Sequence, residues 1–167
     1  MTSTDPLLTI AEVSVAFAGF ASIVTVVASR GADSWSAGNL VRFRLMIYMS
    51  LSSVLFSLLP FSFLLFNVSE LATWQTSSSI LGIYLGCYLV LTIRGFISLV
   101  RQGQLNIYVT GFTAALGVSA ILVQLFSIID AVSAHEGAYF VGVLYLLLMS
   151  AISFARLVAV SILPANR

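Results

Sequence analysis

Five stretches of about twenty or more predominantly apolar residues follow one another along the chain, separated by short polar connections. They cover residues 9–29, 43–66, 79–100, 107–129 and 138–163. A helix needs about 20 consecutive apolar residues to cross the hydrocarbon core of a bilayer. The connections and tails are too short to fold independently in water. The sequence therefore predicts an all-α, polytopic membrane bundle of five transmembrane helices, with residues 1–167 forming a single transmembrane domain.

The composition excludes the soluble classes of protein. Of the 167 residues, 60% are hydrophobic and 8% are charged, whereas an ordinary soluble domain carries about 25% charged residues. The mean hydropathy is correspondingly high, at +1.09. A net charge of +1 provides no basic surface on which a phosphate backbone could be bound. We therefore expect membrane lipids, and not nucleic acid, as partners.

The basic residues mark one side of the predicted membrane domain. All seven are arginines: Arg30, Arg42, Arg44, Arg94, Arg101, Arg156 and Arg167. The acidic residues lie on the other side, with Asp33 as the exception. Because basic residues are retained in the cytoplasm, we expect the N-terminus outside and the C-terminus inside a cell membrane, specifically the bacterial inner membrane. Residues 67–78 are expected at the outer surface, with Trp74 as an interfacial anchor.

The first apolar stretch leaves two topologies open. Gly19, the small residues around it and Glu12 near its start favour a re-entrant or interfacial segment over residues 9–29. Against this, residues 23–27 are apolar and largely β-branched, without a break at which the chain could turn. The five-span topology is our main prediction, and a four-span bundle is the alternative.

Three ionisable residues lie deep enough in the spans to need an explanation: Glu12, Arg94 and Arg156. Ionisable residues within a membrane are costly and are candidate functional sites. The two arginines are about 9–10 Å from the inner ends of their spans at 1.5 Å per residue. A long arginine side chain can cover most of that distance and reach the lipid phosphates. The alternative is that both face the bundle interior and bind an anion, a carboxylate or a partner subunit.

A second set of small or polar residues could line a pore or bind a ligand. The set comprises Glu12, Ala16 and Gly19 on one face of the first span, Ser50, Ser53 and Ser57 along the second, and Gln124 in the fourth. Helix packing and interhelical hydrogen bonds are the competing interpretation of these positions. Pro60 frees the carbonyl of Phe56, and we expect nearby serines to satisfy the freed backbone group.

Glycines in the third and fourth spans are predicted helix contacts. Gly82 and Gly86 have the spacing at which two small residues allow transmembrane helices to approach closely. Gly117 lies on the same stripe of the fourth span as Gln124. We assign these three glycines to helix packing.

The residues used in catalysis and metal binding are scarce. There is one cysteine, Cys87, one histidine, His135, and no lysine. No nucleotide-binding or hydrolase motif is present, and a serine–histidine pair would depend on His135 in an outer connection. We therefore expect no enzymatic activity, no cofactor and no metal site.

The function that remains is a small homo-oligomeric membrane protein that forms an ion or small-solute channel. Several copies could enclose a path that one short chain cannot. The alternative is an accessory or assembly subunit, which would bind a partner membrane subunit and transport nothing itself.

Overall fold

The computed structural model describes residues 5–29, 37–103, 105–131 and 133–162, and this part of the chain is built from helices. They are α1 (Asp5–Ser29), α2 (Ala37–Leu65), α3 (Glu70–Arg101), α4 (Ile107–Ile128) and α5 (His135–Ile162). Four segments are long and apolar enough to cross a membrane: Asn39–Leu65, Glu70–Arg101, Ile107–Ile128 and His135–Ala159. The prediction of a helical, multi-pass membrane protein is therefore supported for α2 to α5.

Helix α1 is continuous over its 25 residues and does not reverse direction. It packs along α2 and α5 and makes no contact with α3 or α4. A re-entrant segment would need a turn, which α1 lacks, whereas a spanning helix and an interfacial helix both fit a continuous helix. That α1 crosses the membrane, and that the N-terminus lies outside, stay predictions.

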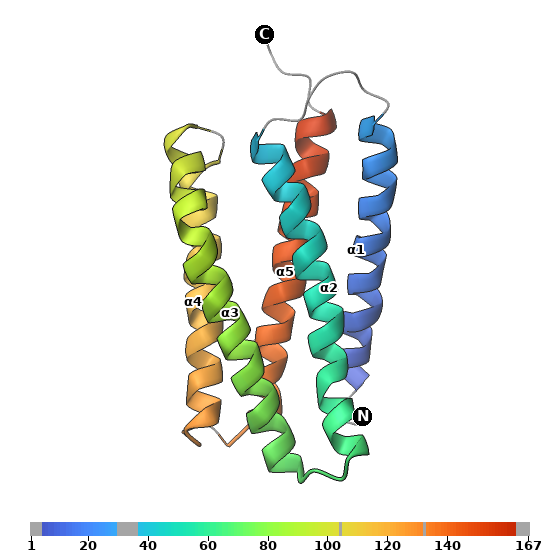
Figure 1. The fold of residues 1–167 in the computed structure, drawn as a ribbon, viewed down its shortest axis with the longest axis vertical. Coiled ribbons are helices and arrows are strands. Elements are labelled where there is room, and N and C mark those ends of the chain that lie inside the picture. The colour runs from blue at the N-terminus through green and yellow to red at the C-terminus, as the bar shows by residue number, and fades with distance from the viewer. Residues whose placement is uncertain (1–4, 30–36, 104, 132, 163–167) are drawn as a thin grey trace.

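The helices run alternately in opposite directions, and the start of α1 and the end of α5 lie at opposite ends of the bundle (Figure 1). One end, which we call the arginine end, carries the described basic residues Arg42, Arg44, Arg94, Arg101 and Arg156. The other, the acidic end, carries the described acids Asp5, Glu12, Glu70, Asp130 and Glu136. This separation of charge in space matches the one predicted from the order of the spans.

The start of α3 differs from the prediction. Residues 67–78 were expected at the membrane surface, but α3 already begins at Glu70. Trp74 is only 3% exposed, and its ring lies 6.0 Å from that of Tyr139. Trp74 is thus part of the protein core at the acidic end and not an interfacial anchor. The serines and threonines here resemble a loop in sequence, yet several of them face neighbouring helices.

Hydroxyl groups join α1, α2 and α5. Ser14 donates to Ser53 Oγ at 2.9 Å, and Ser50 donates to the carbonyl of Ser14. Ser150 of α5 donates to the carbonyl of Met46 in α2 at 3.1 Å. Small side chains with hydroxyls permit close helix contact and add interhelical hydrogen bonds in an apolar medium. These bonds hold the three helices as one group.

The carbonyl freed by Pro60 is satisfied from another helix. Pro60 lies inside α2, and the hydroxyl of Tyr139 in α5 donates to the carbonyl of Phe56 at 2.6 Å. Ser57, the nearest serine, has a buried hydroxyl with no described partner. The expectation that serines satisfy this carbonyl was therefore wrong, since a tyrosine 83 residues away does so.

Candidate functional site

A cavity of about 430 Å³ opens between two groups of helices, with α2 and α5 on one side and α3 and α4 on the other. Along α3 its wall extends from Leu85 to Arg101, which is roughly 24 Å at 1.5 Å per residue. The cavity therefore occupies the arginine half of the bundle, where the α3–α4 pair stands apart from α2 and α5 (Figure 1). Its volume is within the usual range of small-molecule sites, about 300–1,000 Å³.

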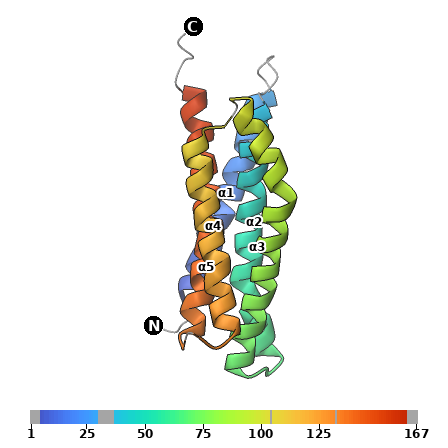
Figure 2. The ribbon, with the colours of Figure 1, turned by 90° about the vertical axis from the view of Figure 1, so that its left-hand side faces the viewer.

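Close packing toward the acidic end closes the cavity. Gly117 lies so near Tyr145 that a Cβ atom at position 117 would be 2.6 Å from the tyrosine hydroxyl. About two turns further on, the Gln124 amide donates to the carbonyl of Ala138 at 2.7 Å. Helix α4 contacts both α3 and α5 (Figure 2). The three helices meet here, and toward the arginine end α5 separates from the α3–α4 pair.

The three glycines assigned to packing differ in their surroundings. Gly117 is in the close contact with Tyr145, and a Cβ at Gly82 would lie 3.4 Å from the Cβ of Gln124. A Cβ at Gly86 would meet no atom within 4 Å. Gly142, which was not among the predicted packing positions, is in an equally close contact. A Cβ there would be 2.6 Å from both Gln124 Nε2 and Leu81 Cδ2.

The cavity wall is mainly apolar, and its charge is confined to one end. Its uncharged polar side chains are hydroxyls: Tyr88, Thr92, Thr110, Thr113, Tyr145 and Ser153. Its charged residues are Arg42, Arg101 and Arg156, and no acidic residue is among the described residues that line it. An apolar cavity with cationic residues at one end is complementary to an amphiphile that has an apolar tail and an anionic head group.

The arginines come from both sides of the cavity. Arg42 of α2 and Arg156 of α5 both line this end of the cavity. Arg42 also donates to the side-chain oxygen of Asn39 at 2.6 Å. Arg101 is the last residue of α3 and belongs to the opposite wall. The sequence analysis singled out Arg156, while it treated Arg42 and Arg101 only as markers of orientation.

Arg94 does not line the cavity with Arg156. It is exposed and contributes to a surface depression beside the cavity, which shares Ile97 and Arg101 with the cavity wall. The two arginines that the sequence paired as candidates therefore lie in different places. The role of Arg94 in binding a ligand stays a prediction.

The other predicted pore or ligand residues are distributed over three regions. Glu12, Ala16 and Gly19 are exposed on α1. Ser50, Ser53 and Ser57 are buried inside the bundle. Gln124 is buried among α3, α4 and α5. The structure does not bring these residues to one site within a single chain, and their role in a pore stays a prediction.

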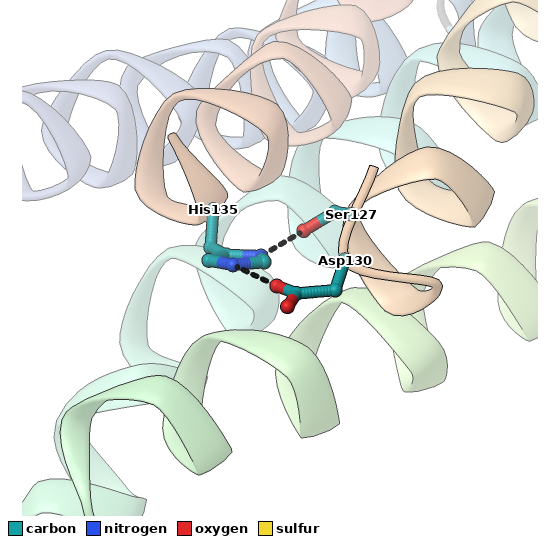
Figure 3. A network of polar contacts seen from close by, with 3 residues as sticks. All are labelled: Ser127, Asp130 and His135. Atoms are coloured by element: carbon teal, nitrogen blue, oxygen red, sulfur yellow. Dashed lines mark hydrogen bonds and ion pairs between the residues drawn. The ribbon is translucent and has the colours of Figure 1, made fainter. Parts of the chain in front are cut away.

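Ser127, Asp130 and His135 form a polar network at the acidic end (Figure 3). His135 Nδ1 shares a hydrogen bond of 3.1 Å with Ser127 Oγ, and His135 Nε2 is 3.0 Å from Asp130 Oδ1. These residue types occur in hydrolase triads. Here, however, the serine is 0% exposed and the aspartate side chain is 71% exposed. A nucleophile must reach its substrate, so this network is better suited to fixing the α4–α5 connection.

Comparison with known proteins found no match: no family model, no curated protein and no solved structure is significantly similar to this chain. The functional conclusion therefore rests on the geometry of the chain itself.

Proposed function

We propose that this protein is an integral membrane protein that binds a membrane amphiphile, with the apolar tail in the cavity and the head group at the arginine end. The observation that supports this proposal is the polarity of the cavity. Its wall is apolar over most of its length, and the charged residues among the described ones that line it, Arg42, Arg101 and Arg156, are all basic and lie at one end. In the orientation that we predict, that end faces the cytoplasm.

The dimensions of the cavity fit a lipid tail. The hydrocarbon core of a bilayer is about 30 Å thick, so the tail of a lipid in one leaflet occupies about half of that. The α3 wall of the cavity is roughly 24 Å long, which covers one leaflet with its head-group region. A tail that leaves the bilayer for this cavity exchanges one apolar environment for another. Specific binding therefore depends on shape and on the head group, and not on the hydrophobic effect.

Filling the cavity is expected to prevent binding. Ala114 lines the cavity, and a tryptophan at that position would occupy the space of the tail. We expect the wild-type protein, extracted in mild detergent, to retain one amphiphile per chain by native mass spectrometry. Ala114→Trp should reduce the retained fraction by about tenfold, which corresponds to about 1.4 kcal/mol.

The neighbouring alanine provides a matched control. Ala115 is exposed and does not line the cavity, so Ala115→Trp adds the same bulk to the same helix outside the site. This variant should retain the amphiphile like the wild type. Equal retention by both tryptophan variants, or no retained amphiphile in the wild type, would contradict the proposed function.

A homo-oligomeric channel is the second candidate function. It is favoured by one face of α1, whose small and polar residues are exposed on the surface of the bundle. Glu12, Ala16 and Gly19 are exposed, as a seam between copies requires, whereas Ser14 on another face is buried. A Cβ at Gly19 would meet no atom within 4 Å, so Gly19→Leu should leave the single chain intact.

The Gly19→Leu variant separates the remaining roles. If α1 forms the seam of a channel, the variant should shift the protein from oligomer to monomer in mild detergent and abolish flux through reconstituted vesicles. Ser53→Leu is a poorer test because Ser53 is buried against Ser14. Unchanged flux with an unchanged oligomer would argue against a pore on this face. A stoichiometric foreign subunit would instead support the accessory role.

A further inference from the structure

The chain joins the α3–α4 pair to the other three helices at the acidic end. The connection from α2 to α3 lies there, and so does the connection from α4 to α5 (Figure 1). The connection between α3 and α4 lies at the arginine end, but it stays within the pair. We propose that the α3–α4 pair is a hinged lid, which pivots about the acidic end and so opens or closes the cavity at the arginine end.

Side-chain packing joins the same two parts on the acidic side of the cavity, in addition to the close helix contacts described above. The ring of Trp74 in α3 lies 6.0 Å from the ring of Tyr139 in α5. Nearer the middle of the bundle, the hydroxyl of Tyr84 in α3 is 2.6 Å from the hydroxyl of Ser52 in α2. The cavity wall on α3 begins at the next residue, Leu85. The pair is therefore fixed at its base, and the cavity separates it from α2 and α5 beyond that point.

Each of the two connections turns at one residue with left-handed backbone geometry. The φ angle is 56° at Asn67 and 59° at Asp130. In both turns the following amide donates back to a carbonyl in the last turn of the helix, from Val68 to Phe63 and from Ala131 to Phe126. This is a common way to end a helix, and residues at the ends of elements absorb the backbone rotation in hinge movements. The two connections thus provide matching pivots at one end of the pair.

The cavity provides the force that closes the lid. Packing, and not the hydrophobic effect, holds helices together within a membrane. Apolar walls that face empty space lose dispersion contacts, so an unfilled cavity of about 430 Å³ favours movement of the pair toward α2 and α5. An apolar tail in the cavity restores these contacts with the lid open. The lid therefore closes on the empty cavity and opens on the filled one.

A small rotation is sufficient for this movement. From Leu81, which is in the close contact with Gly142, to Arg101, α3 is roughly 30 Å long at 1.5 Å per residue. A pivot of about 10° moves the far end of such a helix by about 5 Å. The inference goes beyond the proposed function, because the movement depends on the shape of the cavity and not on the identity of its occupant.

Distances between spin labels test the lid in the full-length protein, with Cys87 replaced by alanine. The reporting pair is Ser98→Cys in α3 with Ala155→Cys in α5, and both positions are exposed near the arginine end. The protein in phosphatidylcholine nanodiscs is compared with the delipidated protein in mild detergent. We expect the distance to shorten by about 5 Å when lipid is removed. Ala114→Trp, which fills the cavity, should keep the longer distance in both samples, whereas Ala115→Trp should behave like the wild type.

Two further label pairs show whether α3 and α4 move as one body. Leu58→Cys with Thr76→Cys connects α2 and α3 near the acidic end, and Leu91→Cys with Phe112→Cys lies within the pair; all four positions are exposed. Close to the pivot the same rotation gives a displacement of less than about 2 Å, and within the pair it gives none. An arginine-end distance that is the same with and without lipid would overturn the inference. So would an equal change within the pair, because α3 and α4 would then move separately.

The outcomes also separate the lid from the proposed function. If Ala114→Trp retains less amphiphile while the arginine-end distance stays constant, the cavity binds its ligand in a rigid bundle, and only the lid is wrong. If the distance shortens on removal of lipid but the wild type retains no amphiphile by native mass spectrometry, the lid stands and the proposed function is wrong.

Discussion

Gly142→Leu is expected to lower the free energy of unfolding by about 2–4 kcal/mol, combining overpacking with the loss of an interhelical hydrogen bond. Even a single Cβ at this position would lie 2.6 Å from Gln124 Nε2 and from Leu81 Cδ2. Gln124 cannot move freely, because the same nitrogen donates to the carbonyl of Ala138. The substitution therefore separates α5 from α3 and α4 at the closed end of the cavity. The free energy of unfolding is measured by titration with a denaturing detergent, with the loss of helicity as the signal.

Gly86→Leu is the control for this result. It makes the same change in another membrane-spanning helix, at a position where a Cβ would meet no atom within 4 Å. We expect its stability to be within about 0.5 kcal/mol of the wild type, as for surface positions generally. If both variants were equally stable, the close contact at Gly142 would not be part of the native packing.

The second prediction with a large expected effect concerns membrane topology. Each introduced cysteine should be either labelled or unlabelled in intact cells. In a background in which Cys87 is replaced by alanine, Asp5→Cys and Asn67→Cys should react in intact cells with a thiol reagent that does not cross membranes. Gln102→Cys should react only after the cells are opened. All three positions are exposed, so differences in labelling report the side of the membrane and not burial.

Each possible labelling pattern has a clear meaning. Labelling of Asp5→Cys together with Asn67→Cys supports five spans with the N-terminus outside. If Asp5→Cys behaves like Gln102→Cys, α1 does not cross the membrane and the five-span topology is wrong. If only Gln102→Cys reacts in intact cells, the orientation is the reverse of the one we predict.

Much of the helical architecture could be predicted because lipid-exposed helices differ from connections in composition. The spans over residues 43–66 and 107–129 correspond closely to α2 and α4. The start of α3 was misplaced because Thr73, Ser77 and Ser78 read as a polar connection. These side chains are buried against other helices, and in a small bundle hydroxyls pack in the interior. Composition reports the lipid-facing side of a helix better than the side facing its neighbours.

The candidate site was less accessible to prediction. A deep arginine is visible in the sequence, so Arg156 could be named. The cavity itself depends on where α3 and α4 diverge from α2 and α5, and this depends on contacts such as the one between Gly117 and Tyr145. No periodicity in one helix encodes the distance to another. The involvement of Arg42 and Arg101 follows only when the cavity is known.

The central claim, that an amphiphile tail occupies the cavity, can be tested most directly by paramagnetic relaxation in the methyl NMR spectrum. The probe is a phospholipid with a nitroxide on its acyl chain. Leu85 lines the cavity and is 2% exposed, whereas Leu91 faces outward at 81% exposure. We predict strong broadening of Leu85 that Ala114→Trp abolishes. Broadening of Leu91 while Leu85 stays sharp would mean that lipid only surrounds the bundle, and would contradict the claim.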